Sequence, residues 1–88
     1  MTHLHVVRPG ARSKSAALAA IGEAMEFPDY YGRNLDALYD CLTDLSWLPP
    51  GKHVLVWEGG DDDVESVLAD AQQAMSAGDR TFAVRYPD

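Results

Sequence analysis

The 88-residue sequence contains a single cysteine, Cys41, and lacks any long apolar run. One cysteine cannot form an internal disulfide or a zinc cluster, so the fold must be held together without either. Small domains of an oxidising compartment often carry disulfides, and the first residues show no signal peptide. No stretch reaches the length of a membrane-spanning helix. We therefore expect a cytoplasmic protein without membrane association.

Positive charge is also scarce. The sequence has 7 Lys and Arg against 14 Asp and Glu, which gives a formal net charge of −7. Such a chain repels phosphate backbones and anionic lipid surfaces, so direct binding to nucleic acid is not expected. A cationic protein is the favoured partner. The length predicts a single domain over residues 1–88 with a modest core, in which a deep enzyme cleft is hard to build.

Short apolar runs bounded by turn residues predict three strands separated by helical segments. The expected strands are residues 3–7, 53–57 and 81–85. Strands joined through helical crossovers are usually parallel, and their connections are right-handed. We therefore predict an α/β fold, a single domain in which a three-stranded parallel sheet is packed with helices.

The helix starts are marked by capping residues. Ser13 or Ser15 can accept a hydrogen bond from a free backbone N–H at the start of the first helix, and Asn34 can do so for the second. Asp62 and Glu65 have capping-box spacing for the third. These residues predict where the three expected helices begin.

The second helix carries the most informative pattern. Its leucines recur at helical spacing and form one apolar stripe, comprising Leu35, Leu38, Leu42 and Leu45. Asp36, Asp40 and Asp44 follow at four-residue intervals, which predicts three carboxylates in a row opposite the stripe. Neighbouring like charges cost about 0.2–0.5 kcal/mol per pair. Tyr39 shares this face, and an aromatic beside charges is typical of interface anchors. The pattern favours a binding face over a merely solvated one.

Other potentially reactive residues have simpler structural interpretations. We expect Cys41 to be a packed thiol and Tyr31 to cover the edge of the core. We expect His53 to lie at the surface and Trp57 in the core, and Trp47 fits either a core edge or an interface rim. His3 and His5 share a strand face, but a metal site is not expected. Asp61, Asp62 and Asp63 are better explained by helix capping than by metal binding, because they lack the spacing of a calcium loop.

Residues 28–43 resemble the signature of the barstar family, the intracellular inhibitors of barnase-type secreted ribonucleases. The family pattern is Tyr-Tyr-Gly-x-Asn-Leu-Asp-Ala-Leu, followed by an aromatic residue and Asp-Cys-Leu-Thr, and every fixed position is present. The resemblance extends from about Ala24 to the end of the chain, whereas the first strand and helix match only in arrangement. It implies a barstar-like α/β fold.

The resemblance also implies that the second helix and its preceding loop enter the ribonuclease active site, where acids stand in place of substrate phosphates. The contact residues carried over by position are Tyr30, Gly32, Asn34, Leu35, Asp36, Tyr39, Asp40 and Thr43. Tyr39 replaces a tryptophan, Asp44 and Leu45 replace a Gly-Trp pair, and Gln73 lies near an interface glutamate of the family. Asp44 and Gln73 therefore complete the predicted partner-binding set.

The leading hypothesis is a monomeric inhibitor that forms a 1:1 complex with a basic extracellular ribonuclease of the barnase type, without cofactor, metal or catalysis. An immunity protein or interaction domain of the same fold, directed at another basic nuclease or toxin domain, is the alternative. A small hydrolase using Asp36 and Asp40 is a third hypothesis. An open helical face does not supply the burial that would separate two carboxyl pKa values, which argues against it.

Overall fold

The computed structural model describes residues 1–87, which form three strands and three helices. In chain order they are β1 (Thr2–Val6), α1 (Lys14–Ala24), α2 (Leu35–Leu42), β2 (Gly51–Val56), α3 (Asp62–Ala74) and β3 (Arg80–Arg85). The sheet order is β1-β2-β3 and both pairs are parallel. The predicted α/β fold is confirmed, and each strand begins one or two residues earlier than expected.

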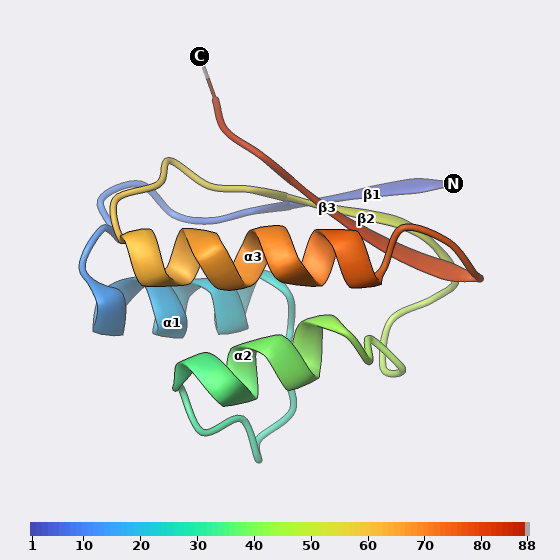
Figure 1. Cartoon of the computed structure of the whole chain (residues 1–88), viewed down its shortest axis with the longest axis horizontal. Coiled ribbons are helices and arrows are strands. Elements are labelled where there is room, and N and C mark those ends of the chain that lie inside the picture. The colour runs from blue at the N-terminus through green and yellow to red at the C-terminus, as the bar shows by residue number, and fades with distance from the viewer. Residues whose placement is uncertain (88) are drawn as a thin grey trace.

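The helices cover one face of the sheet, which is seen edge-on above them in Figure 1. The core lies between these layers, and its largest fully buried side chains include Trp57 and Phe82. The Trp57 indole N–H donates to the carbonyl of Ala11 at 3.2 Å, so the only polar atom of this side chain is paired. The opposite sheet face is open at β1, where Leu4 and Val6 are 57% and 66% exposed.

Side-chain caps begin the helices, as predicted for the first two. Ser13 accepts a hydrogen bond from the backbone of Ala16 at 3.2 Å, and Asn34 accepts one from Ala37 at 2.8 Å. Each bond satisfies an N–H group that has no partner within its helix. The position of Asn34 therefore fixes where α2 starts.

The third helix begins one residue earlier than the capping-box spacing suggests. Asp61, in extended backbone geometry, is the N-cap and accepts from Val64 N–H at 3.0 Å, whereas Asp62 is already helical. Glu65 accepts from Gly60 N–H at 3.1 Å. The prediction of Asp62 as the cap was wrong because Asp61 also has a carboxylate and lies three residues before the N–H that needs an acceptor.

The prediction that His53 lies at the surface was also wrong, since this side chain is fully buried. β2 is the central strand, and alternate residues of a strand point to one face. His53 shares the helix-covered face with Leu55, and both are fully buried. Its ring Nε2 lies 2.8 Å from the carbonyl oxygen of Pro49.

Candidate protein-binding face

The helix α2 is anchored on one side and exposed on the other. Leu38 and Leu42 are fully buried, and Cys41 is a buried free thiol as expected. Burial raises the pKa of the Cys41 thiol, which disfavours the reactive thiolate. Asp36 and Asp40 point to the exposed side of the same helix. The helix therefore presents its carboxylates while its leucines hold it to the core.

The predicted row of three helical carboxylates is shortened to two. The helix ends at Leu42 with Thr43 as its C-cap, so Asp44 lies in the following turn, where its carboxylate accepts from the Ser46 hydroxyl at 3.2 Å. Leu45 then adopts a positive φ of 55° and is fully buried. The Leu45 side chain therefore reaches the core from a turn and not from a further turn of the helix.

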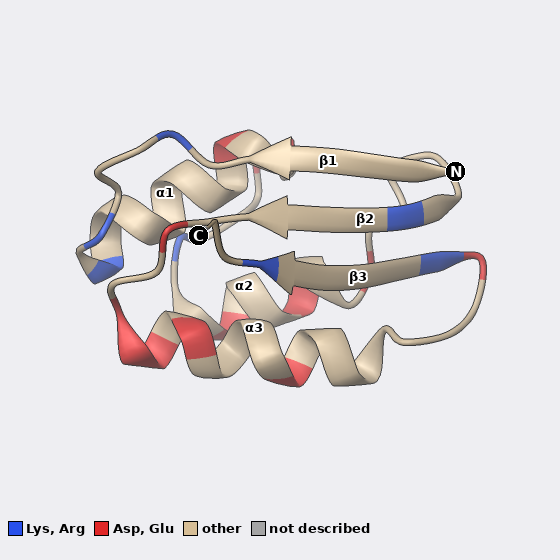
Figure 2. Cartoon of the chain, turned by 90° about the horizontal axis from the view of Figure 1, so that it is seen from above, with Lys and Arg blue, Asp and Glu red and all other residues tan. Residues whose placement is uncertain are grey.

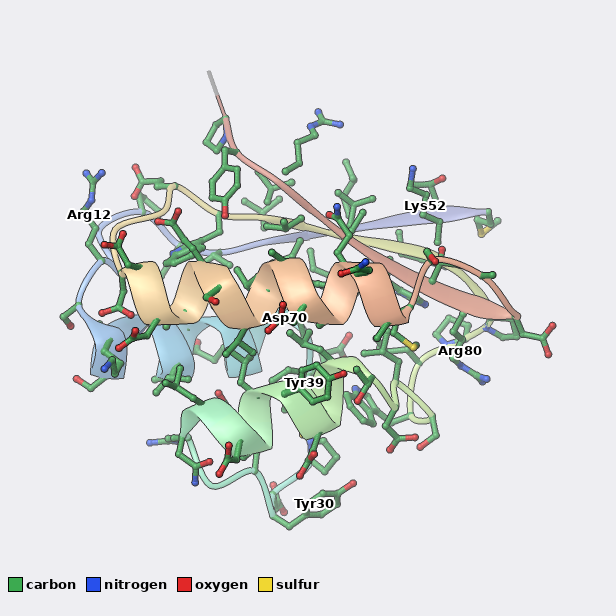
Figure 3. The ribbon with its side chains drawn as sticks, viewed as in Figure 1. Arg12, Tyr30, Tyr39, Lys52, Asp70 and Arg80 are labelled. Carbon is green, nitrogen blue, oxygen red and sulfur yellow. The ribbon has the colours of Figure 1, made fainter. Side chains whose placement is uncertain are left out.

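A hollow of about 480 Å³ lies between α2 and α3. Its lining combines three apolar or aromatic side chains with three carboxylates, namely Leu35, Tyr39 and Val67 with Asp36, Asp40 and Asp70. In Figure 3, Asp70 on α3 lies directly above Tyr39 on α2. The apolar and acidic lining suits a long cationic side chain, whose methylene groups can pack while its charged end meets a carboxylate.

Tyr39 lies between this hollow and a second one. The second hollow, of about 380 Å³, is lined by Tyr39, Asp70, Gln73 and Ala74. Tyr39 is 38% exposed, so it is partly packed and still available at the surface. Gln73 thus belongs to the same surface as the α2 carboxylates, although it lies 33 positions after Asp40 in the sequence.

Asp70 was missed in the sequence analysis. It lies three residues before Gln73 on α3, and residues at this spacing are neighbours on one helix face. Once Gln73 is predicted to contact the partner, this spacing makes Asp70 a further candidate. The packing of α3 beside α2, which places Asp70 opposite Tyr39, arises only from the tertiary structure.

The two tyrosines before α2 have different environments, as predicted. Tyr31 is half-buried, donates its hydroxyl to the Leu18 carbonyl at 3.0 Å and meets Phe27 edge to face with ring centroids 4.6 Å apart. Its burial raises the pKa of Tyr31 to about 12. Tyr30 is 76% exposed and, in Figure 3, projects from the loop below α2, on the side of that helix away from the sheet. Tyr31 therefore anchors the loop and leaves Tyr30 available to a partner.

Several predicted contact residues also shape the site. A Cβ atom on Gly32 would lie 3.0 Å from Asn34 Nδ2, so glycine leaves room for the amide that caps α2. The Thr43 hydroxyl donates to the Tyr39 carbonyl at 2.8 Å. The polar side chains of Asn34 and Thr43 thus bond to the backbone at the two ends of α2. The charged side chains that line the hollow are those of Asp36, Asp40 and Asp70.

Trp47 forms part of the core edge behind this loop. Its indole N–H donates to the Met25 carbonyl at 3.0 Å, and its ring meets Phe27 edge to face at 5.7 Å. These contacts explain its partial burial and favour the core-edge interpretation. Together with Tyr31 and Phe27, Trp47 links the loop before α2 to the turn after it.

Charge is unevenly distributed over the molecule. The charged side chains of α2 and α3 are all acidic. Figure 2 shows these acidic positions along both helices, with Lys and Arg on the strands, at the start of α1 and on the connections around it. On the helices themselves a cationic surface would therefore meet only negative charge, which favours encounter in this orientation, although Arg33 in the loop before α2 lines a hollow together with Asp36.

Comparisons with known proteins show two similarities. Residues 1–87 match the sequence profile of a family described as "Barstar (barnase inhibitor)". A Bacillus subtilis (strain 168) protein named "Putative ribonuclease inhibitor YrdF" is 42% identical over 60 residues. The match covers 60% of this chain and 66% of that relative, slightly less than two thirds of its length. The family description names an inhibitor rather than an enzyme, which argues against the hydrolase hypothesis. No helix within residues 1–87 is long and apolar enough to cross a membrane.

Proposed function

The chain belongs to the barstar family, and on this premise we propose that it inhibits a basic secreted ribonuclease of the barnase type. The inhibitor would use α2 and the preceding loop to cover the nuclease active site in a 1:1 complex. The observation that carries the proposal is the exposed pair Asp36 and Asp40 beside Tyr39, opposite Asp70 across the hollow. The proposal includes action in the cytoplasm, where cellular RNA needs protection.

Charge complementarity explains how such a surface would act. A ribonuclease binds substrate phosphates with Arg and Lys side chains, and a carboxylate can accept the same charge-assisted hydrogen bonds, in bidentate form from Arg. Asp36 and Asp40, one helical turn apart, would occupy neighbouring phosphate positions. The inhibitor therefore competes with RNA without offering a bond to cleave.

The proposed face is held in shape before binding. The Asn34 cap fixes the start of α2, and the Tyr31 hydroxyl bond fixes the loop before it. Fewer conformations then have to be lost on docking, which favours tight binding. Fast association steered by complementary charge is a property of the barnase–barstar pair itself, and we carry it over from the family.

The test is titration of the purified protein against a panel of basic, guanyl-preferring microbial ribonucleases, with RNA cleavage as the readout. We expect at least one nuclease to lose activity linearly until one equivalent of inhibitor has been added. Isothermal titration calorimetry on that pair measures the stoichiometry directly. Unchanged cleavage across the panel, together with binding to the nuclease domain of a toxin, would favour the immunity-protein alternative instead.

A further inference from the structure

All three histidines of the chain, His3, His5 and His53, meet on the helix-covered face of β1 and β2. His3 is the sheet partner of His53, and their rings stack with centroids 4.7 Å apart and planes inclined by 13°. His5 Nε2 lies 3.0 Å from His53 Nδ1. Within residues 1–87, these side chains do not form a group suited to holding a metal ion. The cluster also has no part in the proposed nuclease-binding face.

A chain of three contacts runs through the cluster. His5 Nδ1 lies 3.1 Å from the carbonyl oxygen of Ala24, the last residue of α1. At the other end, His53 Nε2 lies 2.8 Å from the carbonyl oxygen of Pro49, in the segment between α2 and β2. The His5–His53 contact joins these two ends. The chain therefore ties α1 and the segment before β2 to the strands.

The number of protons in this chain can be counted from the chemistry of its ends. A carbonyl oxygen only accepts hydrogen bonds, so His5 Nδ1 and His53 Nε2 must each carry a proton. If both rings are neutral, these are their only N–H groups, and two lone pairs face each other at 3.0 Å. One additional proton between the rings completes the third hydrogen bond. A fourth proton would place two N–H groups against each other.

We propose that His5 and His53 form a proton-dependent clamp, which fastens α1 and the segment before β2 to the sheet when the pair carries one additional proton. We refer to these two residues as the histidine clamp. All three hydrogen bonds of the clamp form when the pair carries a single positive charge. The bond between the two rings is lost when a proton is either removed from the pair or added to it. The inference does not depend on the proposed function, because none of its contacts belongs to the binding face.

The surroundings of His53 oppose a second charge on the clamp. Burial is the main cause that lowers the pKa of His53, and the hydrogen bond to Pro49 acts in the opposite direction. The titratable and charged groups that act on His53 are His3 and His5 from β1 and Arg80 from β3, and each lowers its pKa further. Arg80 is held nearby by its Nε–H bond to the Leu48 carbonyl at 2.8 Å. In the proposed clamp the neutral ring is therefore that of His53, which accepts at Nδ1.

The proton count determines how stability depends on pH. In the unfolded chain each histidine titrates near pH 6.5, so the two residues together bind about one additional proton at that pH. The folded clamp also binds one, so its contribution is greatest near pH 6.5. Above that pH the folded state holds more protons than the unfolded state, and the contribution falls as pH rises. Below it the unfolded state takes up the second proton, and the contribution falls as pH decreases.

The alkaline side of this profile provides the cleaner test, because carboxyl groups do not titrate there. Urea unfolding from pH 6.5 to 7.5, below the range in which the cysteine thiol of the unfolded chain ionises, should show the folding equilibrium constant decreasing with rising pH, by at most about tenfold per pH unit. His5→Gln can still donate to His53 Nδ1 but does not titrate, so the decrease should disappear. His3→Gln is the matched control, because it removes a stacked histidine outside the hydrogen-bonded chain, and the decrease should remain.

A spectroscopic measurement on the unmutated protein keeps the test decisive if His5→Gln does not fold. Nitrogen-15 NMR of the imidazole rings at pH 6.5 should show His5 protonated on both nitrogens and His53 protonated on Nε2 alone. Both rings neutral at pH 6.5 would overturn the proposal. So would a folding constant that stays level between pH 6.5 and 7.5, or a His5→Gln variant that keeps the wild-type decrease.

Discussion

Replacement of Asp40 by alanine tests the proposed binding face most directly. Asp40 has Asp36 one turn before it, Tyr39 beside it and Asp70 across the hollow. A docked nuclease would exclude water from this position, and truncating one partner of a desolvated charge pair costs roughly 2–5 kcal/mol or more. At about 1.4 kcal/mol per tenfold change, the dissociation constant should rise roughly 30- to 4,000-fold. Much of that loss would come from nuclease cations left buried and unpaired.

The same substitution should leave the free protein folded. The Asp40 side chain is exposed, so alanine creates no cavity. Its removal relieves repulsion with Asp36, worth about 0.2–0.5 kcal/mol, and takes a negative charge away from the C-terminal half of α2. The free energy of unfolding, measured by urea titration and circular dichroism, should stay constant or rise slightly. Lost inhibition would then report binding alone.

Asp62→Ala is the matched control. It also removes one exposed carboxylate from a helix, but Asp62 lies in the first turn of α3 and does not line the hollow. Inhibition curves against the cognate nuclease at constant ionic strength should therefore show a large loss for Asp40→Ala and a small one for Asp62→Ala. Equal losses for the two variants would mean that net charge alone governs inhibition, and the proposed docking of α2 would be refuted.

Three further predictions concern the same face. Stopped-flow association rates with the cognate nuclease should fall as NaCl is raised, because salt screens complementary charges, and rates independent of salt would contradict the charge-steering argument. Tyr39→Trp should change the ranking of nucleases in the panel more than it changes the urea midpoint, since Tyr39 lies between the two hollows and is partly exposed; an unchanged ranking would place specificity elsewhere. Asp70→Asn keeps the size of the side chain but removes its charge. It should raise the dissociation constant by about tenfold, which is less than the rise expected for Asp40→Ala. An inhibition constant equal to that of the wild type would show that α3 stays outside the interface.

The sequence was sufficient to predict the elements whose signals are local. Short apolar runs bounded by turns marked the strands, and the crossover rule gave their parallel pairing. Asn34 could be recognised as a cap because the helix signal follows it directly. The assignment of Tyr31 to the edge of the core and of Tyr30 to the binding face was a prediction, and the burial of Tyr31 and the exposure of Tyr30 agree with it.

Features that depend on packing between distant elements could not be predicted. Leu45 continues the helical leucine spacing, so periodicity alone extended α2 to Asp44 and concealed the turn at positive φ. His53 was assigned to the surface because it stands near the start of an expected strand, but the earlier start and central position of β2 bury it. Asp70 becomes part of the candidate face only because α3 packs beside α2. Each of these outcomes is decided by which surfaces meet, and a single sequence does not state that.

The anchoring contacts explain how so short a helix can carry like charges on its exposed side and still remain folded. α2 has 8 residues, too few to persist alone in water, and its exposed side carries like charges. The fully buried side chains of Leu38 and Leu42 pack the helix against the core. The edge-to-face contacts of Phe27 with Tyr31 and Trp47 connect the segment before the helix to the segment after it. Tertiary packing therefore offsets the repulsion, and the carboxylates need form no compensating ion pairs within the fold. A cationic partner would neutralise them, so the free energy gained from charge pairing would stabilise the complex rather than the free protein.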